Sequence, residues 1–327
     1  MVAGDRTVNV AGSALARVAT IILALVTLGT AWAHAAEAIY DPPVGSRWII
    51  ETETRGEETR PEGSTTSLVR TRAELTVEQK TPDGFRISWV QRGATVEGNA
   101  RDVPLRRAYA GVLENVVIRA STDSAGKPLR VDNLDEARAA MRSSADGLVA
   151  QFAERPAARA LFDQLMSELT EVDAGSAASV YVDGLATLAV AQNTGMKRGE
   201  FRSTSKPAEN PLGGDALISN ERFELAKADA AGRLTFVNVT SIDAASMSDF
   251  MHSFAKGLLA ASGDSVTPQR VDLLVKSMVF SFDKRAEFEV EDGMTRKVSE
   301  KSTTVFRGLE QNLIQTEART IAVTRAP

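Results

Sequence analysis

Several stretches of this sequence alternate between apolar and polar side chains with a period of two, which is typical of strands with one buried face. From Val69 to Val77 the odd positions are apolar or Thr, and the even positions are charged or Thr. The turn Thr81-Pro82-Asp83-Gly84 follows, and Phe85, Ile87 and Trp89 then give the inner face of a return strand. Proline fixes φ and glycine permits positive φ, so this segment predicts a hairpin with antiparallel pairing.

The same alternation recurs towards the C-terminus. It runs from Phe280 to Val290, and the turn Glu291-Asp292-Gly293 leads into a return strand from Met294 to Phe306. A last strand is expected from Asn312 to Arg325. Short turns at 123–126 and 229–232 join further pairs of strands.

Helical spacing of apolar residues replaces the alternation between 133 and 200. Asn133 is expected to cap a first helix, with Glu136 three residues later. Pro156 opens a second helix, and Asp173 caps a third that runs towards Ala191. A later helix follows residue 243, and Thr267-Pro268 opens a short one after it.

These blocks predict an α+β fold, in which a curved antiparallel sheet of meander hairpins packs against an inserted helical segment. The blocks are strand-like at 39–132, helical at 133–200, strand-like at 212–242, and helical then strand-like at 243–327.

The Pro- and Gly-containing segment 204–214 is interpreted as a linker between a first half at 36–203 and a second half at 215–327. Gly84 and Gly232 lie in comparable turns, so a duplication of the two halves is one interpretation. A single continuous domain is the alternative.

The N-terminus predicts a secretory signal peptide at 1–35. Arg6 and Arg17 precede the uncharged run Val18–Trp32, which ends in Ala33-His34-Ala35. We expect cleavage after residue 35 or 36 and export by the general secretory route to the bacterial periplasm or the extracellular space. The alternative is an uncleaved anchor, for which the run is short. Without the signal, no stable membrane span is expected.

Composition excludes several classes of function. A net charge of −5 argues against a nucleic-acid partner, because phosphate binding needs a concentrated basic surface. Zero Cys excludes thiolate catalysis and Cys-type zinc sites, and His252 is the single His beyond the signal. No phosphate-binding glycine loop or nucleophile elbow is present. We therefore predict a non-enzymatic protein with no catalytic residues, no metal and no cofactor.

Six aromatic residues on the inner faces of the predicted strands are candidate lining residues for an apolar ligand site. They are Trp48, Phe85, Trp89, Phe280, Phe282 and Phe288. The alternative is that they simply pack against the helices. Lys284 stands between Phe282 and Ala286 on an apolar face. It either ends the buried stretch, extends to an edge, or faces a cavity as a polar ligand group.

Five glutamates crowd the first hairpin, at positions 51, 53, 57, 58 and 62. Glu51 and Glu53 fall on the outer face if Trp48 and Ile50 point inwards. We interpret them as a solvated strand edge that resists aggregation rather than as a catalytic pair.

The segment Pro42–Trp48, followed by long amphipathic strands, resembles exported bacterial proteins of unknown function, as does the 123–126 turn leading to helices at Asn133. The order of elements is also similar to the lipoprotein-carrier fold of the LolA and LolB type. That resemblance implies a curved sheet around helices with an apolar cavity. It places no functional residue on this sequence.

Two functions follow as hypotheses. The first is an exported envelope protein that binds a hydrophobic or lipid-like molecule between sheet and helices. The alternative is a structural or protein-interaction component without a small ligand. In that case the hairpin Met294–Arg325, polar on much of both faces, could pair with a strand of an envelope protein.

Overall fold

A computed structural model describes residues 39–101, 103–152, 155–208, 217–229, 232–262, 266–308 and 311–327. The predicted signal peptide at 1–35 lies outside these residues. Its presence and cleavage stay predictions.

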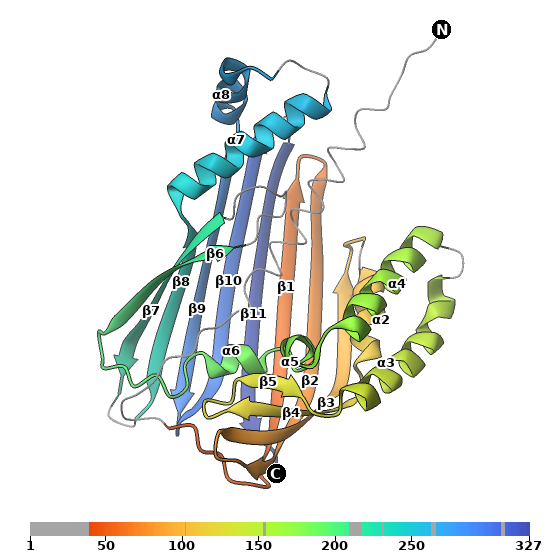
Figure 1. Cartoon of the computed structure of the whole chain (residues 1–327), viewed down its shortest axis with the longest axis vertical. Helices are drawn as coiled ribbons and strands as arrows, with labels where there is room; N and C mark the ends of the chain where they lie inside the picture. The colour runs from red at the N-terminus through yellow and green to blue at the C-terminus, as the bar shows by residue number, and fades with distance from the viewer. Residues whose placement is uncertain are drawn as a thin grey trace.

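In the described part of the chain, eleven strands form one sheet, and each neighbouring pair of strands is antiparallel (Figure 1). The order across the sheet is β5-β4-β3-β2-β1-β11-β10-β9-β8-β7-β6. The strands are β1 (Arg47–Arg60), β2 (Gly63–Lys80), β3 (Gly84–Gly98), β4 (Val117–Asp123), β5 (Pro128–Val131), β6 (Phe201–Ala208), β7 (Leu217–Ala228), β8 (Leu234–Ile242), β9 (Val279–Glu291), β10 (Met294–Gly308) and β11 (Gln311–Arg325).

Helices interrupt the strand order in three places. They are α2 (Val103–Val112), α3 (Leu134–Val149), the 3-10 turn η2 (Ala150–Phe152), α4 (Pro156–Glu171), α5 (Ala174–Tyr181), α6 (Leu185–Ala189), α7 (Ala244–Ala261) and α8 (Pro268–Lys276). The predicted α+β class, with an antiparallel meander and inserted helices, is confirmed.

The two halves of the chain join in the middle of the sheet through β1 and β11. Trp48 pairs with Arg325, and Thr59 pairs with Ile314. Each half runs as a meander of three strands, a helical insertion and further strands: α2 lies between β3 and β4, and α7 with α8 between β8 and β9. Both halves therefore share one sheet. A duplication stays a prediction.

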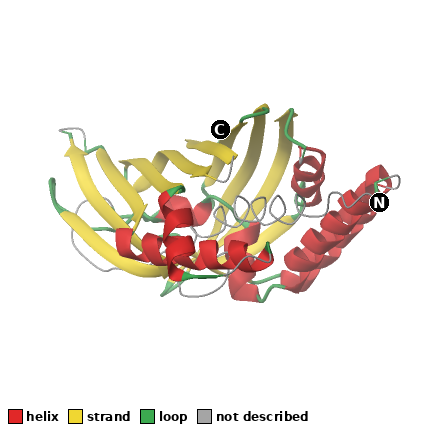
Figure 2. Ribbon diagram, turned by 90° about the horizontal axis from the view of Figure 1, so that it is seen from above, coloured by secondary structure: helices red, strands yellow, loops and turns green. Residues whose placement is uncertain are grey.

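All the helices pack on one face of the sheet, because the strand register brings the apolar side chains there. Ile50 lies directly between Ala73 of β2 and Val323 of β11, and all three are buried. Directly paired residues point to the same face, so one face of this antiparallel sheet is apolar and the other is polar. Figure 2 shows the sheet curving, with the helices gathered on the same side.

The hairpins at 81–84, 123–126 and 291–293 are confirmed, as are three of the predicted helix starts. Pro156 is the first residue of α4. Asp173 accepts hydrogen bonds from the backbone N–H groups of Gly175 and Ser176 at 2.9 and 3.1 Å. Thr267 caps α8 by accepting from Arg270 N.

Two expectations about helix boundaries were wrong. Asn133 makes no side-chain cap for α3, because its amide instead bridges β4 by accepting from Arg119 N and donating to Val117 O. The helix after Asp173 stops at Tyr181 and restarts at Leu185, because Gly184 adopts a φ of +92°.

The helix α2 was missed because it buries residues on two sides. Ala108 and Val112 join the main core, while Val103 and Ala110 pack with Val96 of β3, so no single apolar stripe marks it. The predicted linker was also wrong for residues 204–208, which belong to β6. Polar residues occupy both faces there, which concealed the alternation, and Pro207 is tolerated because β6 is an edge strand. Residues 209–216 lie outside the described part.

The alternative pairing surface also needs correction. The hairpin Met294–Arg325 is β10 and β11, which have partners on both sides in the centre of the sheet. Its polar residues therefore do not mark an open edge. Across the described strands, the open edges are those of β5 and β6.

Candidate functional site

Two separate apolar clusters hold the helices against the sheet. The large core packs the helices α2, α3, α4, α5 and α6 against one end of the strands. It includes Leu75, Met141, Phe162, Phe236 and Phe288. The small core joins α7 and α8 with the opposite end of β7, β10 and β11. It comprises Leu217, Phe250, Met251, Phe254, Ala255, Val271, Met278, Phe306 and Leu313.

Between the two cores, one line of directly paired residues crosses the helix-side face of the sheet. We call it the polar row. From β6 to β3 its members are Thr204, Glu221, Thr240, Lys284, Ser302, Glu317, Gly56, Ser67 and Gly98. None of them is apolar. Along β7 to β11, the helix-side face thus changes from apolar in the large core to polar in this row and back to apolar at the small core.

Lys284 lies in this row with its ammonium Nζ 3.1 Å from Glu300 Oε1. The two side chains are only 16% and 12% exposed. Lys284 sits between Phe282 and Ala286 on the helix-side face, as its position in the alternation predicted. Glu300 is the residue that holds it there.

A second ion pair ties the helices to the same region. Arg319 of β11 donates from Nη2 to Asp183 Oδ2 at 2.8 Å, and its side chain is 16% exposed. Asp183 stands in the turn between α5 and α6, where Gly184 takes its positive φ. In the strand register, Arg319 of β11 is also the residue directly opposite Glu300 of β10.

Glu317 is the carboxylate of this region that has no hydrogen-bond donor among the described residues. Burial raises the pKa of Glu317 above the ordinary value for a glutamate. Arg319, Arg106 of α2 and Lys284 oppose that rise, and Glu300 adds to it. Because burial outweighs three cations, this carboxylate is poorly solvated.

A second acceptor lacks a partner on the same face. Asn238 Oδ1 of β8 is buried without a hydrogen-bond donor in the described structure, beside Ala286 and Phe223 in the strand register. Three strand spacings, or about 14 Å, separate β8 from β11, so Asn238 and Glu317 are too far apart to bond the same ligand atom.

The six predicted lining residues do not come together. Trp48, Phe85, Trp89 and Phe288 are buried within the large core. Phe280 packs at the small core, with its ring centroid 5.6 Å from that of Phe250. Register places Phe280 about 40 Å from Trp48 along the strand direction.

Phe282 and Phe280 do lie next to Lys284 on β9. Phe282 is partly buried and pairs with Thr304 of β10, between the small core and the polar row. The structure therefore brings together Phe280, Phe282 and Lys284, and leaves the other four aromatic residues in the packing of the large core.

Sequence reasoning missed Glu300, Glu317 and Arg319. On β10, Glu300 lies two positions from the buried Val298 and so points to the same face. On β11, Glu317 and Arg319 alternate in phase with the buried Ile321 and Val323. The alternation therefore carried a signal for their orientation. It did not show which of them would meet, because that depends on the register between β9, β10 and β11.

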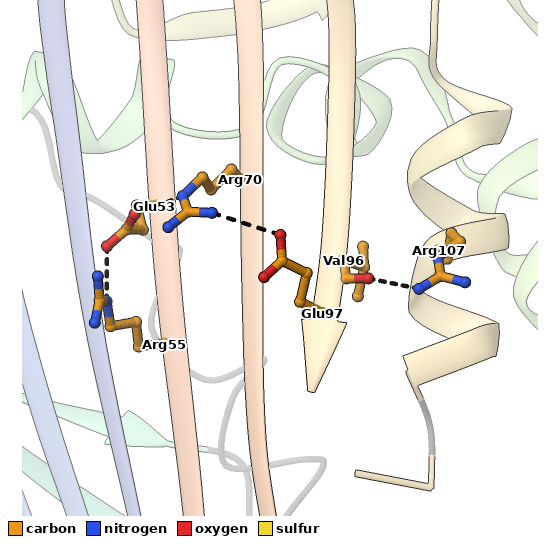
Figure 3. A network of polar contacts seen from close by, with 6 residues as sticks. All are labelled: Glu53, Arg55, Arg70, Val96, Glu97 and Arg107. Carbon is orange, nitrogen blue, oxygen red and sulfur yellow. Dashed lines mark hydrogen bonds and ion pairs between the residues drawn. The ribbon is translucent and has the colours of Figure 1, made fainter. Parts of the chain in front are cut away.

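The opposite face carries exposed ion pairs of a different kind (Figure 3). Arg70 Nε lies 2.8 Å from Glu53 Oε2, and Arg70 Nη1 lies 3.7 Å from Glu97 Oε1. Arg55 Nε is 2.7 Å from the other oxygen of Glu53, and these contacts lower the pKa of Glu53. Glu53 thus faces solvent, as expected. Because β1 lies in the centre of the sheet, Glu53 belongs to a cross-strand ladder of ion pairs and not to a strand edge.

No arrangement for chemistry on a metal stands out, since the described residues contain no group of three or more side chains placed to hold a metal ion. Nor does the described chain contain a helix of the length and hydrophobicity needed to cross a bilayer. The polar row and its neighbours offer hydrogen bonds and charges for binding.

Comparison with known proteins gives no family. No protein-family model matches this chain, and no curated protein matches it either.

Three of the solved structures that align with this chain show how low the similarity is. A lipovitellin structure, described as showing lipid–protein interactions, aligns with a TM-score of 0.41 at 8% identity over 87% of this chain and 26% of its own. This chain thus spans about a quarter of lipovitellin. An outer membrane channel from Pseudomonas putida F1 gives a TM-score of 0.18 at 10% identity, over 90% of this chain and 100% of the channel. The translocator domain of the autotransporter NalP from Neisseria meningitidis gives 0.18 at 7% identity, over 98% and 99%. With TM-scores below 0.5, none of them identifies a ligand.

Proposed function

We propose that this protein is an exported, non-enzymatic binding protein. It holds an amphipathic, lipid-like molecule against the middle of the helix-side face of its sheet. The single observation that carries this proposal is the polar row, with its half-buried charges, lying between two apolar cores on the face that the helices cover.

Packing alone does not account for the polar row. An antiparallel sheet that packs against helices on one face normally keeps that face apolar. Moving charged groups out of water costs free energy that an ion pair recovers only in part. Lys284, Glu300 and Arg319 nevertheless stand where strand neighbours such as Ala286, Val298 and Ile321 are buried. A cost of this kind is typical of binding sites.

The neighbours of the row favour an amphipathic ligand. Phe280 and Phe282 provide an apolar surface on β9 that continues into the small core through Phe250. Two residues further along the strand, Lys284 and its partner Glu300 provide polar groups. A molecule with an apolar chain and a polar head matches this change of chemistry along one strand.

Export and absence of catalysis are part of the proposal. The signal-like segment at 1–35 supports export to the periplasm or beyond the cell. Lys284 and Arg319 are held in ion pairs with Glu300 and Asp183, which favours a binding role over turnover.

Native mass spectrometry of residues 36–327, purified from the natural host and extracted with organic solvent, tests the proposal. We expect a lipid or other amphiphile at near-stoichiometric amount. Phe282→Ala should reduce the retained amount, whereas Phe201→Ala, an exposed residue on the opposite face of β6, should not. A bare polypeptide that also binds no added amphiphile contradicts the proposal.

A further inference from the structure

Hydrogen-bonding capacity in the polar row is unevenly used. Lys284 of the row forms an ion pair with Glu300. Arg319, beside the row on β11, forms one with Asp183. Glu317 has acceptor oxygens and no donor within the described residues. Its neighbour in the row on the β1 side is Gly56, which has no side chain to cover the carboxylate. The available function at this point is therefore a hydrogen-bond acceptor.

Three cations and three carboxylates, counting Glu317 itself, lie on the strands and helices around this position, and their charges balance. The cations are Lys284 of β9, Arg319 of β11 and Arg106 of α2; the carboxylates are Glu300 of β10, Asp183 of the α5–α6 turn and Glu317 itself. A negative head group would be repelled by Glu317 or would have to break an existing ion pair. A positive head group would gain no net attraction, because the three cations offset the three carboxylates.

We infer that the polar row binds the head of the amphiphile, that this head is uncharged and hydroxylated, and that Glu317 accepts a hydrogen bond from it. This inference rests on the proposed function. A hydroxyl donor satisfies the carboxylate without adding charge.

The other members of the row suit the same head. Ser302 flanks Glu317 on β10, Thr240 flanks Lys284 on β8, and Ser67 follows Gly56 on β2. Each hydroxyl can donate or accept, as recognition of a polyol requires.

Three amphiphiles with the same dodecyl chain test the inference on residues 36–327: dodecyl maltoside, dodecyl sulfate and dodecylammonium. Each is titrated below its critical micelle concentration by calorimetry. We expect the maltoside to bind most tightly. Glu317→Leu should weaken maltoside binding by about tenfold or more, as expected for losing a hydrogen bond to a charged group.

Glu317→Gln, which keeps the shape and one acceptor, should weaken it less. The matched control is Glu287→Gln, on the opposite face of β9, which should leave all three affinities unchanged. Circular dichroism of each variant establishes that it is folded.

The pH dependence gives a second readout. A protonated carboxyl is a weaker acceptor, so maltoside affinity should fall as pH decreases through the pKa of Glu317, and this fall should be absent in Glu317→Gln.

The outcomes separate the two proposals. Tightest binding of the sulfate or the ammonium, or equal binding of all three with no effect of either Glu317 variant, overturns the head-group inference and leaves the proposed function standing. If none of the three binds and no amphiphile is extracted, the proposed function itself fails.

Discussion

The ammonium of Lys284 and the carboxylate of Glu300 lie 3.1 Å apart on the face of the sheet that packs against helices. They come from neighbouring strands, and the residue directly opposite Lys284 is Ser302, so the pair is diagonal. Most other ion pairs on the strands, such as Arg70 with Glu53, lie on the opposite face with more exposed side chains. This pair should therefore respond differently to substitution.

Removing one partner should cost more than removing both. We expect Lys284→Met to lower the free energy of unfolding by about 1–3 kcal/mol, because it leaves Glu300 poorly solvated and unpaired. The double variant Lys284→Met/Glu300→Gln should recover part of that loss. Urea denaturation of the two single variants and the double variant measures the coupling. As a control, Lys297→Met, which breaks an exposed pair with Glu289, should change stability by less than about 0.5 kcal/mol.

Glu317 should make stability depend on pH with a defined sign. Its folded pKa is raised by burial, so the folded state binds a proton that the unfolded state releases at the same pH. Its contribution is therefore lost as pH rises from the ordinary glutamate pKa through the folded pKa. Relative to wild type, Glu317→Gln should be more stable at neutral pH and lose that advantage in acid. Thermal melts of both proteins from pH 4 to 8 measure the difference, and parallel curves would contradict the assignment.

Phe288 should behave as a core residue and not as a ligand contact. It is buried beside Phe223, with ring centroids 6.0 Å apart, and pairs with Val298 of β10. Phe288→Ala should reduce the free energy of unfolding by about 3–5 kcal/mol. Phe201→Ala, on the exposed face of β6, should cost far less. Denaturant titration distinguishes them, and similar losses would show that Phe288 is not packed as described.

Gly184 should resist replacement because its φ of +92° is strained for any residue with a side chain. Gly184→Ala should destabilise the fold by about 1–3 kcal/mol and displace Asp183 from Arg319. Gly257→Ala is the matched control. Gly257 lies inside α7, where an added Cβ meets no atom within 4 Å, so the change should stabilise by about 0.4–1 kcal/mol. Melting temperatures of the two variants should move in opposite directions.

Much of the fold could be predicted because alternation, turns and caps are local signals. The alternation in Val69–Val77 and Phe280–Val290 predicts strands, and Asp173 and Pro156 predict helix starts. The strand β6 could not be predicted in this way, since an edge strand with polar residues on both faces shows no apolar alternation. The same holds for α2, which divides its buried residues between two clusters.

The candidate site could be predicted only in part. Lys284 stands out because it interrupts an apolar face. Its meeting with Glu300, and the convergence of Glu317 with Arg319 and Asp183, depends on pairings between segments far apart in sequence. The aromatic residues were grouped by type, although register separates Phe280 from Trp48 by most of the length of a strand. The similarity in element order to the LolA and LolB carriers stays an expectation from the sequence.

The pairing of β1 with β11 gives this chain an unusual order of assembly. Strands from near the two ends of the sequence meet in the centre of the sheet, so the central contact is the most distant one along the chain. Contacts of this range slow folding. Until β11 has been synthesised, the two half-sheets would each expose a long unpaired edge. A truncated product lacking those last residues would keep that edge open and be prone to aggregation.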